Sequence, residues 1–144
     1  MNESNRIIAT KVPAGDRLGF FPGDESHPGL FGARHMLRGS TLVYNWMGRL
    51  CQRYNGGYWE FYTLSNGGSY MVPAGIEKMR IEVDEGNGFD GEMSADAAGI
   101  VATLFALGQL ASETEEDLIS ERYHLLRDFA LEHAESNLIL RAID

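Results

Sequence analysis

The sequence has 144 residues, and its 21 acidic side chains against 12 basic ones give a formal net charge of −9. A chain of this length usually folds as one domain and buries enough surface to need neither disulfides nor a metal to hold its core. The negative charge disfavours sequence-independent binding to nucleic acid, and a hydrophobic fraction of 44% is too high for a disordered acidic tail.

Residues 1–33 are predicted to form an irregular N-terminal arm, because prolines and glycines interrupt every short pattern within them. The arm also contains large apolar side chains that a flexible linker would lack: Leu18, Phe20, Phe21, Leu30 and Phe31. We therefore expect the arm to pack on the body of a single domain that spans residues 1–144.

Apolar side chains recur at helical spacing from about Arg34 to Tyr54. One face of this predicted helix contains Leu42, Val43, Trp46, Met47, Leu50, Cys51 and Tyr54. Ser40 is a candidate N-cap, although the helix could also begin near Arg34 and tolerate Gly39. The sequence Asn55-Gly56-Gly57 predicts the end of the helix, since glycine accepts the left-handed conformation that stops one.

Three or four short strands are predicted next. Residues 58–64 are rich in aromatic side chains, residues 65–68 are a strong hairpin signal, and residues 69–72 suit the returning strand. Residues 78–84 alternate between apolar and charged side chains, which is typical of a half-buried strand. After a turn at residues 86–88, a short stretch ending near Met93 is the last candidate.

The second half of the chain is predicted to be mainly helical. Ser94 is a good N-cap for a helix over residues 95–111, which is apolar almost all round and is therefore expected in the core. Thr114 is expected to cap another helix with Glu115, Glu116 and Asp117 in its first turn. Residues 138–144 fit either a short helix or a strand. These elements predict an α+β fold, with a small antiparallel sheet of three or four strands packed with about four helices.

No set of residues indicates catalysis. The four histidines lack zinc-ligand spacing, Cys51 lies on the apolar face of its helix, and no Gly-x-Ser-x-Gly elbow occurs. The glycine clusters lack the lysine and the strand–helix context of a phosphate-binding loop. We therefore predict no catalytic, cofactor-binding or metal-binding residue, and expect that the protein is not an enzyme.

The negative charge is concentrated in one half of the chain. Residues 1–72 have a net charge of +2, whereas residues 73–144 have a net charge of −11. Such asymmetry often marks a surface that faces a partner, although solvated helix faces would produce it too. The acidic candidates for partner binding are Asp84, Glu85, Glu115, Glu116, Asp117 and Glu121.

The aromatic strand offers a second candidate surface. Trp59 and Phe61 are expected on one face of the strand, and Tyr58, Glu60 and Tyr62 on the other. Tyrosine is enriched at the energetic centres of interfaces, but both faces could instead be buried. An alternative function is therefore a non-enzymatic adaptor or regulatory domain that binds through this aromatic strand face.

Several longer segments together resemble the ArdB/KlcA family of antirestriction proteins, in order over residues 16–111. The matching segments are Arg17–Pro22, Arg34–Gly39, Gly56–Leu64, Asn66–Gly68, Gly88–Glu92 and Ser94–Leu107. The resemblance implies a compact α+β protein of plasmids or other mobile genetic elements. Such a protein would protect incoming DNA from type I restriction enzymes by blocking cleavage, without catalysis of its own. The family provides no catalytic or cofactor residue to transfer to this chain.

The resemblance also implies a protein partner, either the type I restriction-modification complex or an associated host factor. Some antirestriction proteins mimic DNA, but a mimic of ten base pairs would need about twenty ordered charges. A net charge of −11 over half the chain instead favours a local acidic patch that steers the protein to a basic surface. Direct binding to nucleic acid or to a membrane is not expected. A single cysteine and an N-terminus without the apolar core of a signal peptide favour a cytoplasmic location.

Overall fold

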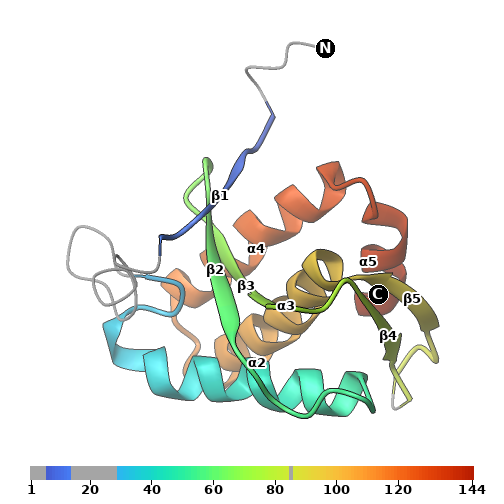
Figure 1. The fold of residues 1–144 in the computed structure, drawn as a ribbon. Helices are drawn as coiled ribbons and strands as arrows, with labels where there is room; N and C mark the ends of the chain where they lie inside the picture. The colour runs from blue at the N-terminus through green and yellow to red at the C-terminus, as the bar shows by residue number, and fades with distance from the viewer. Residues whose placement is uncertain (1–5, 14–28, 85) are drawn as a thin grey trace.

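Helix α3 (Ala95–Thr114) lies at the centre of the molecule and contacts β3, α2, α4 and α5 in the computed structural model (Figure 1). The structure describes residues 6–13, 29–84 and 86–144. As predicted, Ser94 caps the helix, since its hydroxyl accepts a hydrogen bond from the Ala97 amide at 3.1 Å. By length and hydropathy α3 could cross a membrane, yet 67% of its most apolar window is buried inside the molecule, as in the core helix of a globular domain.

The strands form two separate antiparallel sheets. One sheet has the order β1 (Ala9–Lys11), β2 (Trp59–Leu64) and β3 (Ser69–Pro73), and the other pairs β4 (Lys78–Glu82) with β5 (Asp90–Ser94). The α+β prediction is therefore confirmed, with its strands divided between a sheet and a two-stranded ribbon. Strand β1 belongs to the N-terminal arm and was not predicted, because three residues are too few to show the period of a strand.

The predicted hairpin between β2 and β3 is present and is held against α4 (Asp117–Glu132). The Gly67 amide donates to the Leu64 carbonyl at 2.9 Å, and Gly67 has a φ of 98°, which favours glycine. The Asn66 side chain donates to the Leu125 carbonyl of α4 at 2.9 Å. The turn therefore fixes the sheet relative to the C-terminal helices.

Helix α2 (Met36–Leu50) follows a single 3-10 turn at Ala33–His35, so the alternative start near Arg34 is correct and Ser40 is not the N-cap. The Ser40 hydroxyl is inside the helix and donates to the Met36 carbonyl at 2.9 Å. The helix ends before the predicted stop at residues 55–57, because Cys51 is already extended, with a φ of −127°.

The arm contributes to the core where it is described. Leu30 and Phe31 are completely or almost completely buried, and the Phe31 ring occupies the space in which a β-carbon at Gly39 would lie. The other apolar side chains expected to pack, Leu18, Phe20 and Phe21, lie outside the described residues. The single domain over residues 1–144 therefore stays a prediction.

The last two helices are α4 and α5 (Ser136–Ile143), so the C-terminal residues form a helix and not a strand. Thr114 is not the N-cap of α4, because α3 continues to that residue and Glu116 takes the cap position. Of the three acids predicted for the first turn of α4, only Asp117 lies there. The Thr114 hydroxyl instead accepts from the Glu116 amide, at 3.2 Å, within the connection between the two helices.

Candidate functional site

The aromatic strand has the two faces that its alternation predicts. Trp59 and Phe61 are buried on the side of the core, while Tyr58, just before β2, is 59% exposed. Glu60 and Tyr62 are half-buried on the other face, where Tyr70 of β3 is 1% exposed and stacks on Phe129 of α4, so a helix covers part of this face too. The structure therefore brings Tyr58, Glu60 and Tyr62 together on one face.

This face is already occupied in part by contacts within the protein. The Glu60 carboxylate pairs with the Lys11 ammonium of β1 at 3.2 Å. The Tyr62 ring stacks on Tyr70 with centroids 5.2 Å apart, and burial together with the nearby charge of Glu60 raises the pKa of its hydroxyl. Tyr58 is consequently the most accessible aromatic side chain of the face.

The acids predicted at residues 115–117 lie at the junction of α3 and α4, where basic side chains from the start of α2 contact one of them, Glu116, and also Glu113, which was not predicted. Glu116 pairs with His35 and with Arg34, the latter at 3.5 Å. Glu113 accepts two hydrogen bonds from the Arg38 guanidinium, at 3.1 and 2.6 Å, which lower the pKa of its carboxyl. The junction is therefore partly neutralised.

The remaining acidic candidates are not gathered at that junction. Asp84 is exposed after β4, beside a hollow that Arg49 of α2 also lines. Glu116 pairs with His35 at the start of α2, whereas Arg49 lies at the end of that helix. The α3–α4 junction and the hollow beside Asp84 are therefore about 20 Å apart along α2. Glu85 lies outside the described residues. The predicted acids therefore belong to at least two surfaces.

Helix α4 presents a row of carboxylates that sequence analysis recognised only in part. We name it the acidic ridge and define it as Asp117, Glu121, Asp128 and Glu132, all exposed and spaced by four, seven and four residues. This spacing places the four on one side of a helix, and it is the signal by which Asp128 and Glu132 could have been found. Glu115 is exposed next to the start of the ridge.

The acidic ridge is not neutralised from within its own helix. Arg122 turns toward the β2–β3 hairpin, where it donates to the Gly67 carbonyl, and Arg127 pairs with Asp144 at 3.1 Å. None of the four ridge carboxylates takes part in an ion pair with a described residue. The ridge thus keeps its negative charge at the surface.

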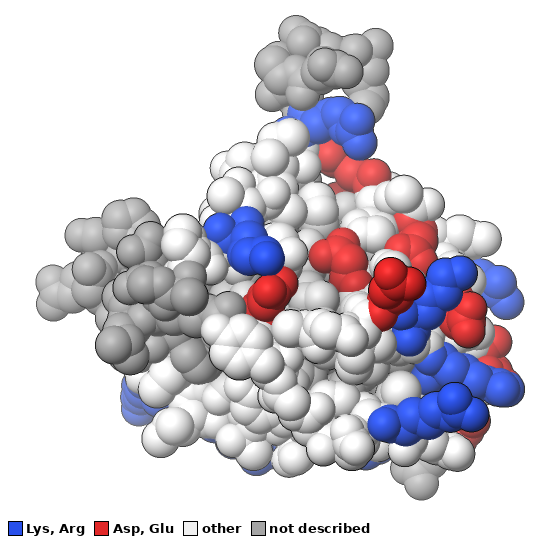
Figure 2. Space-filling model, viewed as in Figure 1, with Lys and Arg blue, Asp and Glu red and all other residues white. Residues whose placement is uncertain are grey.

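Elsewhere the charges are mixed. Over the β4–β5 end of the molecule, acidic and basic side chains lie side by side (Figure 2). There Arg80 donates to both carboxylate oxygens of Asp90, at 2.8 and 2.6 Å, and Lys78 lies 3.9 Å from Glu92. This end therefore has no field of a single sign.

A partly buried polar cluster joins β3 to the helices. The Tyr70 hydroxyl donates to Asp96 at 2.7 Å, and His133 Nε2 lies 2.7 Å from the other Asp96 oxygen. The Glu135 amide donates to His133 Nδ1 at 2.9 Å, so the ring proton belongs on Nε2, which donates to Asp96. Burial alone would raise the pKa of Asp96, but these hydrogen bonds outweigh it and lower that pKa. Burial and the charge of Asp96 raise the pKa of Tyr70. The role of this cluster is to hold the elements together.

The residues with potential for covalent or metal chemistry are kept apart. Cys51 is buried just after the end of α2, whereas His35 lies before its start and is bound to Glu116, so the two cannot form a catalytic pair. Within residues 6–13, 29–84 and 86–144, no group of three or more histidine, cysteine or acidic side chains is placed to hold a metal ion.

Comparison with known proteins gives matches along almost the whole chain. The family model described as antirestriction protein matches residues 52–144. Antirestriction protein KlcA of Escherichia coli is 57% identical, over 96% of this chain and 94% of that protein. An uncharacterised protein of Escherichia coli strain K12, YfjX, is 47% identical over 96% of this chain and 88% of its own length.

A solved structure matches the fold over the full length of both chains, with a TM-score of 0.83 and 54% sequence identity. It belongs to work on the KlcA and ArdB proteins, which are described as having a novel fold and antirestriction activity against type I DNA restriction systems in vivo but not in vitro.

Proposed function

This chain belongs to the antirestriction protein family, and we propose that it protects incoming DNA by inhibiting cleavage by type I restriction endonucleases. The observation that carries the proposal is the agreement of the whole fold, at a TM-score of 0.83 and 54% identity, with a protein that has this activity in vivo. Similarity over the full length supports a shared activity more strongly than a shared motif would, because it includes the surfaces as well as the core.

The proposed action is inhibition without catalysis, through contact with the type I restriction-modification complex or an associated host factor. A relative that is active in vivo but not in vitro favours a target that includes a cellular component. The separation of Cys51 from His35 is also consistent with binding as the mode of action. Type I enzymes attack DNA that has entered the cell, so the protein would act in the cytoplasm of a cell receiving a plasmid or another mobile element.

The acidic ridge is the surface that we assign to the first encounter with that partner. Complementary charge raises the rate at which two proteins associate and selects against wrong partners. Restriction complexes must have basic surfaces, since they bind DNA phosphates. Four exposed carboxylates on one helix, together with Glu115, would direct this protein to such a surface.

Full mimicry of DNA is not part of the proposal, because the ridge is too sparse. Its four charges extend over about 22 Å of helix, or one charge in roughly 6 Å. A DNA duplex has about one charge per 1.7 Å of its axis. The ridge therefore has about a third of the charge density of the duplex, which suits steering and not replacement of DNA.

The proposal is tested by transforming unmodified plasmid DNA into cells that express a type I system, with and without this gene. We expect the gene to raise the number of transformants, because fewer of the incoming plasmids are cleaved. A matched strain without the restriction system controls for uptake. Equal transformation with and without the gene in the restricting strain would refute the proposed function.

A further inference from the structure

Strand β4 pairs with β5 alone in the part of the chain that the structure describes, so one of its edges is open. The register of the two strands determines which backbone groups face that edge. The Ala95 amide donates to the Glu77 carbonyl at 3.0 Å, and the Val83 amide donates to the Phe89 carbonyl at 2.8 Å. Hydrogen-bonded pairs alternate along an antiparallel ladder, so the odd-numbered residues of β4 are those that bond to β5.

The even-numbered residues of β4 therefore point their backbone N–H and C=O groups away from β5. They are Lys78, Arg80 and Glu82, and no described residue hydrogen-bonds to their backbone. These unpaired donors and acceptors form a row about 14 Å long, with groups recurring about every 7 Å. The side chains of the same residues are already paired in charge, since Arg80 contacts Asp90 and Glu82, and Lys78 lies 3.9 Å from Glu92.

The outward edges of two other strands are covered, which distinguishes them from the edge of β4. On β3, the Met71 amide donates to the Thr103 hydroxyl of α3 at 3.3 Å. On β5, the Ser94 amide donates to the Glu135 carboxylate at 2.9 Å. Proteins usually cover or block a strand edge because its unpaired groups can pair with another chain. The row on β4 is left open to such pairing.

A hollow of about 710 Å³ lies beside β4, at the end of α2 (Figure 1). The even-numbered residues of β4 line one side of it, and residues 51–55, which follow α2, line the other. The nearly buried side chains of Cys51 and Met79 also line the hollow, together with the exposed side chain of Ile76. The open edge of β4 is therefore next to a space with an apolar base.

The wall opposite β4 is held in place by Tyr54. The Tyr54 hydroxyl accepts a hydrogen bond from Trp59 Nε1 at 2.8 Å, and the two rings meet edge to face with centroids 5.8 Å apart. The Tyr54 amide donates to the Cys51 carbonyl at 3.2 Å. A wall that is already ordered reduces the entropy lost when a ligand binds.

We propose that an extended segment of a partner protein binds in this hollow as a third strand, antiparallel to β4. Alternating donors and acceptors at the spacing of a strand match the backbone of another extended chain, whereas a helix uses its own backbone groups internally. Main-chain hydrogen bonds would provide the affinity, and alternate side chains would provide the specificity.

The surroundings of the edge define the side chains of that segment. Every second side chain would point toward Ile76 and Met79 and should be apolar. The others would lie beside side chains of β4 whose charges are already paired, and should be polar and uncharged. The site is separate from the acidic ridge, and the proposal does not depend on the proposed function.

Amide hydrogen exchange, followed residue by residue by NMR, tests the proposal because β4 contains its own control. In the free protein, the amides of Met79 and Ile81 should exchange slowly and those of Lys78, Arg80 and Glu82 rapidly. The probe is the acetylated and amidated peptide Ser-Val-Thr-Val-Thr-Val-Ser. At ten times its Kd, it should slow the three even-numbered amides about tenfold and leave the two odd-numbered amides unchanged.

A pair of variants tests the role of the backbone at the centre of the row. Arg80→Pro removes the outward N–H without removing a bond to β5, and proline is tolerated where the N–H of a strand faces away from its neighbour. Arg80→Thr is the matched control, since it loses the same contact with Asp90 but keeps the N–H. Arg80→Pro should weaken the peptide by about tenfold relative to Arg80→Thr. Slow exchange of the Ile81 amide in both variants would show that β4 and β5 remain paired.

Several results would overturn the proposal. Even-numbered amides that are protected in the free protein, and lose that protection on dilution, would assign the edge to a second copy of this chain. No change in any of the five amides at about 1 mM peptide would mean that the edge does not take a strand. Equal slowing of both sets would indicate general stabilisation, and equal affinity of the two variants would show that the backbone N–H is not used.

Discussion

Replacing Gly99 with alanine tests how closely the central helix packs on the sheet. A β-carbon at this position of α3 would lie 3.0 Å from Val72 Cα and 3.2 Å from the Met71 carbonyl carbon, and closer still to the Met71 carbonyl oxygen. These are backbone atoms of β3, which cannot move aside as the tip of a side chain can. Helix and strand would have to separate by several tenths of an ångström.

Two opposing terms determine the size of the effect. Alanine is favoured over glycine inside a helix by about 1 kcal/mol. Overpacking a rigid core costs about 1–3 kcal/mol and more when backbone must shift. Because the strained contact is with backbone on a strand whose residues are all buried, the cost exceeds the gain. We expect Gly99→Ala to reduce the free energy of unfolding by about 1–3 kcal/mol and to lower Tm by several degrees.

Urea and thermal denaturation, followed by circular dichroism, would measure this loss. Gly108→Ala is the matched control, since it lies in the same helix but its β-carbon would meet only Tyr123, at 3.7 Å. That variant should be as stable as the wild type, or more stable by up to about 1 kcal/mol. If Gly99→Ala were as stable as Gly108→Ala, α3 would not lie on β3 as closely as described, and the reasoning would be wrong.

The other predictions concern surfaces and pH. Converting the four carboxylates of the acidic ridge to amides should reduce protection against type I restriction without changing Tm. The control variant Asp84→Asn should change neither protection nor Tm. Unaltered protection in the ridge variant would remove the ridge from the proposed mechanism. Tyr62→Ala should lower stability because it loses the stack on Tyr70, and Tyr58→Ala, at a side chain that is 59% exposed, should lower it less. A loss of protection with Tyr58→Ala that exceeds its change in Tm would indicate binding through the aromatic strand face. The pKa of Asp96 is lowered in the folded protein. The contribution of Asp96 to the free energy of unfolding is therefore complete above the ordinary carboxyl pKa, and it is lost as the pH falls through the pKa of the folded state. Asp96→Asn should therefore cost about 1 kcal/mol at neutral pH, a small loss because solvent screens a side chain that is 38% exposed, and should flatten the loss of stability in acid; an unchanged acid profile would contradict this assignment.

The elements with the clearest period could be predicted from the sequence. Helix α3 was found with its cap at Ser94 because a long apolar stretch follows a residue type that satisfies free amides. The alternation over β4 was equally clear, since Met79 and Ile81 are buried between exposed charges. The caps proposed at Ser40 and Thr114 were wrong, because both hydroxyls bond to backbone inside or at the end of a longer helix than the sequence suggested.

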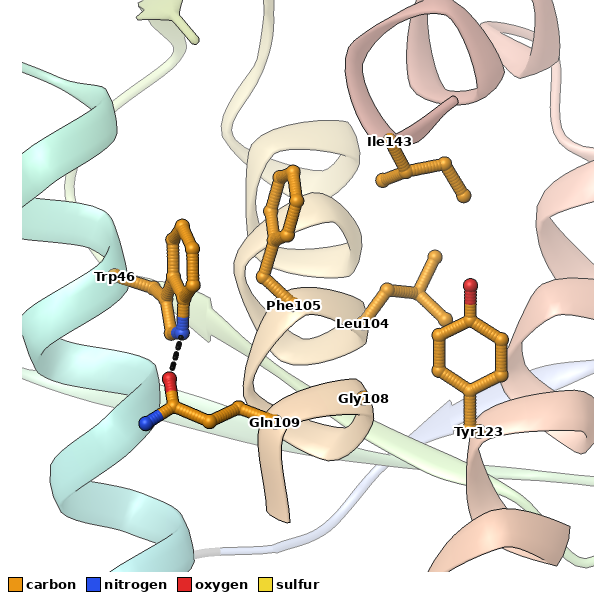
Figure 3. Close-up of a pocket in the computed structure, with 7 residues that line it drawn as sticks. All are labelled: Trp46, Leu104, Phe105, Gly108, Gln109, Tyr123 and Ile143. Carbon is orange, nitrogen blue, oxygen red and sulfur yellow. Dashed lines mark hydrogen bonds between the residues drawn. The ribbon is translucent and has the colours of Figure 1, made fainter. Parts of the chain in front are cut away.

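The candidate sites could be predicted only in part, because they depend on contacts between distant residues. Glu113 and Glu116 pair with Arg38 and His35, which lie 75 and 81 positions earlier. The hollow lined by Trp46, Phe105 and Ile143 forms only because side chains of three helices meet there (Figure 3). By contrast, the acidic ridge follows from spacing within one helix, so a closer reading of residues 117–132 could have found it.

The central claim is protection of DNA from type I restriction, and phage plating tests it most directly. Unmodified phage would be plated on a host with a type I system that expresses either this gene or the same gene with an early stop codon. The proposed function predicts a higher plating efficiency with the intact gene, and no difference on a host without the restriction system. Equal plating efficiency on the restricting host, with the protein present and folded, would contradict the claim.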